Sequence, residues 1–241
     1  SIHNIALQIL LRKAGLEPLK AGRPSKADGT VKLVVMAPPD MPPALAQKSI
    51  DGYIVADPFN AAAEVNKIGK ILRFTGDIWR DHACCVVAVR EQLIEKRPDV
   101  AQAFVGAVVR AQAAVRKDPA DAARELTEGK YLPQPGPVVR WALTHGSDPA
   151  YRGTAIQHPE WRQRRIDFRA FPFASYTAEL IERMRETVVD GDLSFLDGLD
   201  GARAHRELVD DRLARQAIEA NGGPEAFDLP ASLERTEEIA P

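Results

Sequence analysis

The chain has few cysteines, no long apolar run and little net charge. Among 241 residues there are 2 cysteines, and they are adjacent, so they cannot build a disulfide framework; a bond between neighbouring residues is strained. No apolar run approaches the roughly 20 residues that a membrane-spanning helix needs. The formal net charge of -2 argues against a general nucleic-acid binder.

The rest of the composition is that of a protein with a packed core, with 45% hydrophobic and 27% charged residues. The length suits one large domain or two small ones. The chain has no initiator Met and no signal-peptide pattern, and its first residues, SIHNIALQILLRKAGL, already have helical spacing, with Ser1 able to cap. We therefore expect this chain to be part of a longer protein, or a processed or trimmed form.

Helical and strand-like segments alternate over the first ninety residues. Short apolar runs bounded by turn residues predict strands, and the segments between them have helical spacing. This alternation predicts an α/β fold with a mostly parallel sheet. The expected strands are 31–36, 52–56, 70–74 and 84–89, and the expected helices are 1–14, 42–47 and 59–68.

The remainder of the chain predicts mainly helices. The stretch LPQPGP, 132–137, breaks the helical pattern, and residues from about 147 to 172 show no clean period. They predict a long connection that carries the basic run WRQRRIDFR, and a connection of this length is usually functional or packed on another body. The expected helices are 91–96, 98–116, 119–126, 176–189, 202–208 and 211–220.

The sequence contains no strong catalytic or metal-binding signature. The five histidines are scattered, and there is no P-loop, no GxSxG, no CxxC and no GxGxxG after a strand. Asp77 and Asp81 flank Trp79, but this spacing is more typical of a solvated loop. The charges of ELIERMRET predict i,i+4 pairs on an exposed helix face. The basic run could meet an anionic partner, although a solvated loop is the commoner role.

The two cysteines allow several interpretations. The plainest is that CCVVAV is a buried strand with small apolar thiols. An intermolecular bridge or a metal site is a less frequent alternative. Neighbouring residues on a strand point to opposite faces, so at most one of the two thiols would face a cleft.

Polar and proline-rich loops adjoin the expected strands. SIHN opens the first helix, MAPPDMP and ADPFN each follow a strand, and TGDIWRDHACC precedes the last strand. Ligands of open parallel sheets bind where the carboxyl ends of the strands meet, so these loops would line one cleft. Helix N-termini there present free N–H groups and a positive dipole end, which suits an anion. A purely structural proline turn would have the same sequence.

These junctions, in this order, resemble the nitrate/sulfonate/bicarbonate (taurine-like) family of ABC-transporter solute-binding proteins. The similarity runs through PPDMPPALA, IDGYIVADPFNAAAE, GKILRFTGDIWRDHACCVVAV and EKRPDVAQAFVGAVVRAQ. It continues through KYLPQP and FPFASYTAELIERMRETVVDGDLSFL, and so covers most of the chain. The motifs are specific as a set rather than singly.

The resemblance implies a periplasmic-binding-protein-like type II fold, in which two α/β lobes hold a ligand between them. Residues 1–90 would form the second, ligand-binding lobe, with a crossing strand near 86–90. Residues 91–241 would form a helical C-terminal region that packs on the first lobe. The opening strands of that first lobe are expected to be missing from this sequence, and part of the family's ligand site with them.

The resemblance also implies a ligand site. Ser1, His3 and Asn4 fall at a helix N-terminus that faces the cleft, and His3 matches a histidine that contacts the anion in nitrate binders. A capping or chain-end role is the alternative for His3, and an N-cap role is the alternative for Asp57. The other ligand-binding candidates are Pro39, Asp40 and Met41 of a rim loop, Asp57, Pro58, Phe59 and Asn60 of an acid-Pro-aromatic loop, and Trp79, His82 and Cys85 of the last junction.

One departure from the family pattern bears on the ligand. Nitrate- and bicarbonate-type members carry a lysine shortly after the histidine, as HPEK, whereas this chain has HACC with Cys85 at the place of the lysine. A thiol with the ordinary pKa of about 8.5 carries no charge at neutral pH. The resemblance therefore predicts a sulfonate- or carboxylate-like organic anion ahead of nitrate or bicarbonate.

The implied function is the solute-binding component of an ABC importer, without catalytic residues, metal ligands or cofactors. It would be periplasmic or anchored outside the membrane, and its partners would be a small-molecule solute and the transmembrane permease subunits, not nucleic acid. A ligand-sensing regulatory module of the same fold is one alternative. A cysteine-dependent enzyme, desulfinase-like or pyrimidine-synthase-like, is another, since Cys84 or Cys85 beside His82 weakly resembles a Cys–His pair.

Overall fold

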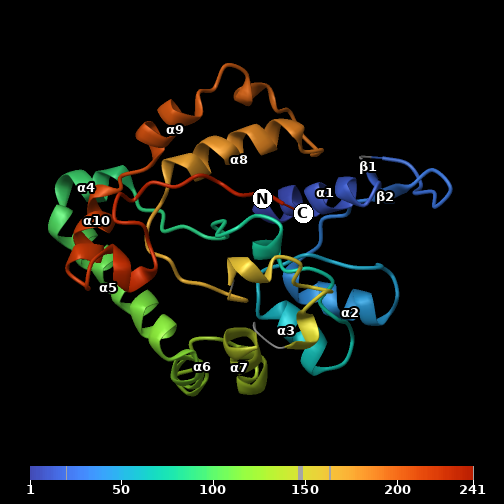
Figure 1. The fold of residues 1–241 in the computed structure, drawn as a ribbon, viewed down its shortest axis with the longest axis horizontal. Coiled ribbons are helices and arrows are strands. Elements are labelled where there is room, and N and C mark those ends of the chain that lie inside the picture. Colours follow the sequence, from blue (N-terminus) through green and yellow to red (C-terminus); the bar gives the residue numbers. More distant parts are fainter. Residues whose placement is uncertain (20, 146–148, 163, 241) are drawn as a thin grey trace.

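The computed structural model describes residues 1–19, 21–145, 149–162 and 164–240. Helices lie around the outside of the molecule, and long segments without regular structure cross its middle (Figure 1). Near the centre, Ile239 forms a backbone bridge with Trp79, which packs on Ile2 and Ile5 at the start of the chain. Helices combined with a small parallel sheet confirm the α/β class in its coarse form.

Most of the predicted helices are confirmed, with ends that differ by a few residues. Their starts follow local rules: Pro98 and Pro119 stand in first turns, where a missing N–H costs little, and the Asp118 carboxylate accepts two N–H groups of its helix. The helices are α1 (Ile2–Lys13), α2 (Met41–Ala46), α3 (Phe59–Val65), α4 (Glu91–Lys96), α5 (Pro98–Lys117), α6 (Pro119–Glu128), α8 (Ala174–Glu186), α9 (Gly201–Leu208) and α10 (Arg212–Glu219).

One helix was not predicted. The helix α7 (Gly136–Thr144) begins inside the proline-rich stretch that was expected to break the pattern. Prolines before a helix and in its first turn are compatible with helix formation, so LPQPGP marks a start. Short 3-10 turns also occur, at η1 (Pro38–Asp40), η2 (Thr75–Asp77), η3 (Pro149–Tyr151), η4 (Pro159–Trp161), η5 (Ser194–Leu196) and η6 (Pro224–Phe227).

The predicted sheet is mostly not formed. Strands β1 (Glu17–Leu19) and β2 (Thr30–Lys32) pair in parallel, with Glu17 opposite Thr30, and only β2 overlaps a predicted strand. The segments 52–56, 70–74 and 84–89 are not strands in the described structure, so these predictions were wrong.

The physical reason is that an apolar run becomes a strand only when a neighbouring chain segment pairs with its backbone. Several of their apolar side chains face solvent instead of a neighbouring strand: Leu72 is 80% exposed and Val86 76%, as is Val35, at 100%, beyond the end of β2. Residues 53–56 are partly buried but have no pairing strand. The apolar content of a segment therefore does not show whether a neighbouring segment is available to pair with it.

Four apolar clusters of the described residues hold the helices together, and two of them bear on the site discussed below. The larger one joins α5 and α10 to the C-terminal segment, and the smaller one packs α8 over the start of α1. Contact between α8 and α9 is close, because a Cβ atom on Gly201 would lie 2.6 Å from the Ala178 Cα. The larger cluster consists of Val109, Phe171, Phe173, Ala214, Ala217, Ile218, Phe227, Leu229 and Leu233, and the smaller one of Ile2, Ile5 and Trp79.

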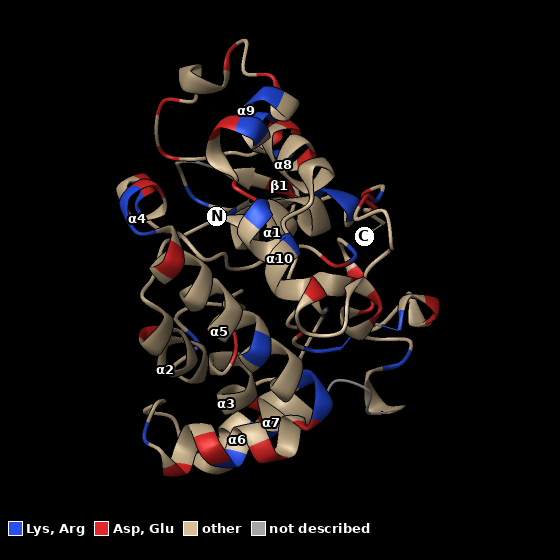
Figure 2. Cartoon of the chain, turned by 90° about the vertical axis from the view of Figure 1, so that its left-hand side faces the viewer, with Lys and Arg blue, Asp and Glu red and all other residues tan. Residues whose placement is uncertain are grey.

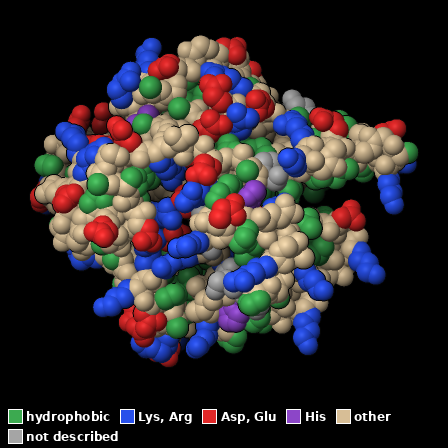
Figure 3. Space-filling view, in the orientation of Figure 1, with side chains coloured by type: hydrophobic (Ala, Val, Ile, Leu, Met, Phe, Trp, Pro, Cys, Tyr) green, Lys and Arg blue, Asp and Glu red, His purple; other side chains and the backbone are tan. Residues whose placement is uncertain are grey.

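The outer surface carries both signs of charge. Lys and Arg lie among Asp and Glu on the outer helices and across the face shown (Figures 2 and 3). On α8, Arg183 pairs with Glu179 at 2.8 Å, which confirms the predicted i,i+4 pairing, and also with Glu186 at 2.7 Å. Among the described helices, none has the length and apolarity to cross a membrane.

Buried charged side chains hold the long connection in place. Asp77, expected in a solvated loop, is 2% exposed. Its carboxylate accepts the N–H groups of Gln157 and His158, each at 2.8 Å, and pairs with Arg73 at 2.5 Å. The solvated-loop prediction failed because the two N–H groups that Asp77 accepts lie about eighty residues further along the chain. A local DxxxD spacing gives no information about such distant partners.

The basic run is neutralised by carboxylates of the protein itself. Arg165 pairs with Asp57 and Glu64, and Arg169 pairs with Asp167 at 3.0 Å and with Asp81. The anionic partner considered for this run is therefore internal for these two arginines. Residues 146–148 at the start of the predicted connection, and Gln163 within the run, lie outside the described residues.

We predict that Asp77→Asn lowers the free energy of unfolding by about 3 kcal/mol, because it leaves Arg73 buried without a countercharge. Urea unfolding monitored by tryptophan fluorescence measures this loss. Asp121→Asn is the matched control, since Asp121 pairs with Arg124 on the exposed face of α6, and a much smaller loss is expected. Equal losses in the two variants would contradict the anchoring role of Asp77.

Candidate functional site

The N-terminal turn of α1 is fixed by a core contact rather than by a cap. Ser1 occupies the N-cap position, but its side chain makes no capping hydrogen bond, so the predicted capping role is wrong. Ile2 and Ile5 point inward and pack on Trp79, which has no exposed surface. This leaves His3, between the two isoleucines, on the opposite side of the turn, with an intermediate exposure.

His3 lies directly beside the cysteine pair. The His3 Nε2 atom is 3.6 Å from the Cys84 Sγ, within reach of an S–H···N contact. Burial lowers the pKa of His3, and the positive chain terminus lowers it further, so the ring is neutral near pH 7. A neutral imidazole can either donate or accept a proton at this position.

Both cysteines are exposed, which overturns the interpretation of CCVVAV as a buried strand. The segment is not a regular strand, and the two Sγ atoms lie 3.7 Å apart on the same side instead of on opposite faces. Partial desolvation and the contact with Cys85 raise the pKa of the Cys84 thiol to about 11. A nucleophilic cysteine needs a lowered pKa, so this environment disfavours the cysteine-dependent enzyme.

His82 and Trp79 are the more buried neighbours of His3 and the cysteine pair. The His82 Nδ1 atom lies 3.0 Å from the Trp79 carbonyl oxygen, and burial lowers the pKa of His82. The Trp79 indole donates to Glu237 at 2.8 Å, so this predicted ligand residue is buried and occupied within the protein. Tyr176 of α8, which the sequence analysis did not single out, donates its hydroxyl to the Ala83 carbonyl at 2.7 Å and fixes the segment that carries the cysteines.

Asn4 also has internal partners. Its side-chain amide donates to the Val188 carbonyl at 3.3 Å and accepts from Gln8 at 3.0 Å. Gln8 is completely buried and bonds both the N–H and the C=O of Val188, at 2.9 and 2.7 Å. Together these amides tie α1 to the segment after α8, so Asn4 positions the helix that carries His3.

Asp57 belongs to a different, buried group. Its carboxylate pairs with Arg165 at 2.7 Å and accepts the Ala61 N–H at 3.0 Å, in the first turn of α3. The Arg165 side chain is 1% exposed and also pairs with Glu64 at 2.5 Å. The Asp57 carboxylate therefore serves the helix start and an internal ion pair, in line with the alternative role weighed for it.

Hydrogen bonds complete this charged group. Tyr151 donates to Glu64 at 2.6 Å, and Trp141 donates to Glu64 at 3.3 Å. Burial alone would lower the pKa of Arg165, but the bonds and charges of Asp57 and Glu64 outweigh it, so its pKa is raised. Burial, with the bond to Glu64, raises the pKa of Tyr151 to about 12. In the sequence, Arg165 stands out in one respect, namely its place in the basic run.

The remaining predicted residues lie just before α2 and α3 or in the first turns of these helices, where local contacts hold them. Pro39 and Asp40 are exposed in η1, and Met41 opens α2, which packs on η1 and α3. The Phe59 carbonyl accepts the Tyr53 hydroxyl at 3.1 Å. Pro58 precedes α3, and the Asn60 amide donates to the Val55 carbonyl at 2.6 Å. These contacts define the loops and leave their ligand roles as predictions.

Two cavities of the described structure lie away from the predicted residues. The smaller, of about 280 Å³, is lined by arginines with carboxylate partners, such as Arg80 with Glu238 at 2.7 Å and Arg235 with Glu237 at 2.7 Å. Its charges are compensated, which does not favour an anion site. The larger, of about 570 Å³, lies along α8 and the start of α9. Neither of these two cavities is lined by His3 or by the cysteines, and both cysteines are exposed.

We predict that acid weakens the fold partly through His82. Its pKa is lowered in the folded state, so below about pH 6.5 the unfolded chain takes up a proton that the folded chain does not. The free energy of unfolding should therefore fall between about pH 7.5 and about pH 5.5. His82→Gln should reduce this fall, as measured by urea unfolding at both pH values. An identical fall in wild type and variant would contradict the role of His82.

Comparison with known proteins adds evidence of another kind. Over 110 residues the chain is 31% identical to a nitrate/nitrite binding protein, NrtA, of Nostoc sp.. The aligned region covers 46% of this chain and 23% of that protein. Over 198 residues it is 27% identical to a bicarbonate transport ATP-binding protein, CmpC, of Synechococcus elongatus, which covers 76% of this chain and 28% of that protein.

The chain thus spans less than a third of the length of these curated relatives. No solved structure matches it. The model of the NMT1-like family matches residues 1–128, more than half of the 241 residues. The chain therefore belongs to the NMT1-like family, and its predicted resemblance to the nitrate/sulfonate/bicarbonate solute-binding proteins of ABC transporters is confirmed.

Proposed function

We propose that this chain is part of the solute-binding component of an ABC importer. It captures a small organic anion of the sulfonate or carboxylate type, or a nitrate-like solute, and delivers it to a membrane permease. The observation that carries this proposal is the group at the start of α1, where His3 lies 3.6 Å from Cys84 on an accessible surface. The similar proteins, a nitrate/nitrite binding protein and a bicarbonate transport ATP-binding protein, support the same class of system.

The chemistry of this group suits a weakly held anion. The first turn of α1 has N–H groups without intrahelical partners, and the positive end of the helix dipole lies there. His3 is neutral near pH 7 and can donate one hydrogen bond, and Cys85 adds no positive charge where nitrate- and bicarbonate-type members have a lysine. A larger organic anion, which gains from apolar contact as well as charge, fits this set better than a small inorganic ion.

For the finer architecture we propose a periplasmic-binding-protein-like type II lobe at 1–90 and a helical region at 91–241 that packs on a first lobe. Exposed valines support this, because Val34 and Val35 lie between β2 and η1, and Val86 and Val87 follow the cysteines. Exposed apolar side chains in consecutive positions are typical of a surface that another body covers. Lobe closure around the solute, and a site outside the membrane for the whole protein, belong to the same proposal.

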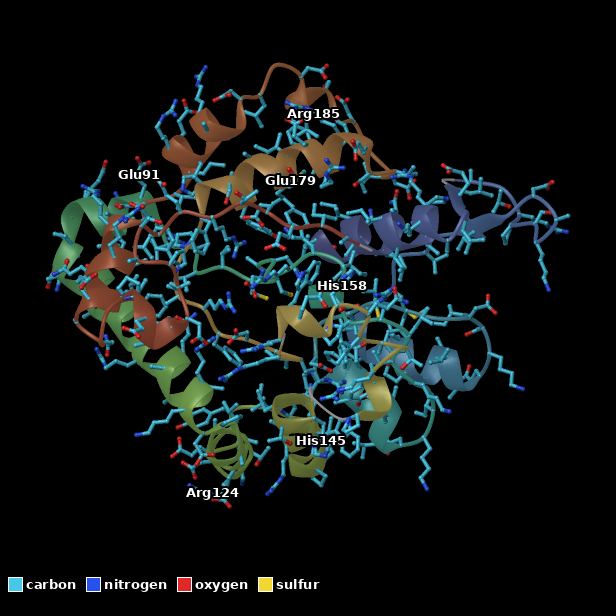
Figure 4. All side chains as sticks on the ribbon, in the orientation of Figure 1. Glu91, Arg124, His145, His158, Glu179 and Arg185 are labelled. Atoms are coloured by element: carbon cyan, nitrogen blue, oxygen red, sulfur yellow. The ribbon has the colours of Figure 1, made fainter. Side chains whose placement is uncertain are left out.

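The test is a thermal-shift screen of this chain against nitrate, bicarbonate, taurine, alkanesulfonates and aromatic carboxylates. A solute at a hundredfold excess over its Kd stabilises the native state by about 2.7 kcal/mol. We expect a shift with an organic anion, and we expect His3→Ala to abolish it. His145→Ala is the matched control, since His145 follows α7, away from α1 (Figure 4), and it should keep the shift.

The outcomes are distinct. A shift that survives in His3→Ala would place the solute elsewhere, and no shift with any of these solutes would contradict solute capture by this chain. Cys85→Lys then tests the solute class, because it restores the charge found in nitrate- and bicarbonate-type members. That variant should respond more strongly to nitrate or bicarbonate than wild type, and an unchanged response would contradict the proposed role of position 85.

A further inference from the structure

The two exposed thiols of Cys84 and Cys85 form a pair with unusual spacing. Their Sγ atoms lie 3.7 Å apart, far longer than the S–S bond of about 2.05 Å. A direct disulfide between neighbours would also be strained, because its Cα atoms are only about 3.8 Å apart. Cys84 and Cys85 are therefore poorly placed to form a disulfide with each other.

The same spacing suits one atom placed between the two sulfurs. A thiolate bond to a metal such as zinc is about 2.3 Å long, so a tetrahedral metal centre bonded to both sulfurs separates them by roughly 3.7 to 3.8 Å, and the pyramidal bonds of trivalent arsenic bring them somewhat closer. The observed 3.7 Å falls in this range. Because both side chains are exposed, such a centre can reach the pair from solvent.

We propose that Cys84 and Cys85 form a dithiol clamp for a thiophilic centre with two exchangeable ligands, of which a trivalent arsenical and a soft metal cation are the two sources. The described residues hold no group of three or more His, Cys, Asp and Glu side chains arranged for a metal ion. The clamp therefore uses two sulfurs, and the other positions of the bound centre remain with its own substituent or with solvent.

The reaction with an arsenical balances without an oxidant. With the hydrated arsenical, which carries two hydroxyl groups on arsenic, two S–H bonds and two As–O bonds break, two As–S bonds form, and each proton leaves with a hydroxide as water, so arsenic stays trivalent. The His3 Nε2 atom, 3.6 Å from the Cys84 Sγ, is placed to accept the proton of that thiol during exchange. His3 is thus a positioning residue for the rate of binding, while the affinity comes from the two sulfurs.

The experiment uses the reduced chain and phenylarsine oxide, with free thiols counted by a colorimetric reagent and adducts by intact mass. We expect one arsenical per chain, loss of both thiols together, and reversal by an excess of a small dithiol but not of a monothiol. Cys84→Ser and Cys85→Ser should each weaken binding at least about a hundredfold, because the second bond is then no longer intramolecular. His3→Ala should slow binding and leave the affinity nearly unchanged.

Cadmium ions, followed by the sulfur-to-metal absorption band, distinguish the two sources. Binding that needs both cysteines extends the clamp to soft cations, whereas binding of the arsenical alone restricts it to trivalent arsenic. Two arsenicals per chain, or single-cysteine variants that bind as well as wild type, would overturn the clamp. The inference does not depend on solute capture, because thiol counts report the clamp even if no anion binds.

Discussion

The buried pairing of Arg165 with Asp57 and Glu64 is the interaction on which much of this architecture depends. It joins the long connection to the start of α3, and Tyr151 and Trp141 close the group with hydrogen bonds to Glu64. A charged group that is almost fully buried is tolerable only when it is paired and its hydrogen bonds are satisfied. Charged anchors thus act together with buried side chains such as Trp161 and Phe171 in a segment that has few helices and no apolar period.

This arrangement divides the residues that the family resemblance had grouped together. Asp57 is occupied by Arg165, and Trp79 is occupied by Glu237 and the core. His3 and the cysteine pair remain on the surface, next to the positive end of α1. Among these residues, His3 and the cysteine pair are therefore the ones that lie toward the surface, whereas Asp57 and Trp79 are engaged by other side chains of the protein.

Local patterns predicted local structure well and distant partners poorly. The helix spacing and first-turn prolines gave most helices, for example α4 with its two ends. The apolar runs near Val35 and Val86 gave wrong strands, because strand formation depends on a neighbour that no local pattern reveals. The same limit hid Asp77, whose partners follow eighty residues later. His3 was found through the family motif, whereas its contact with Cys84 needed the three-dimensional structure.

The most direct test of this division is a double-mutant cycle with Asp57→Asn and Arg165→Met, read out both as unfolding free energy and as affinity for the anion with the largest thermal shift. A structural ion pair predicts a coupling of about 0.5 to 3 kcal/mol in stability and an unchanged anion affinity in folded Asp57→Asn. Additive losses of stability, together with weaker anion binding in that variant, would contradict the account and return Asp57 to the ligand site.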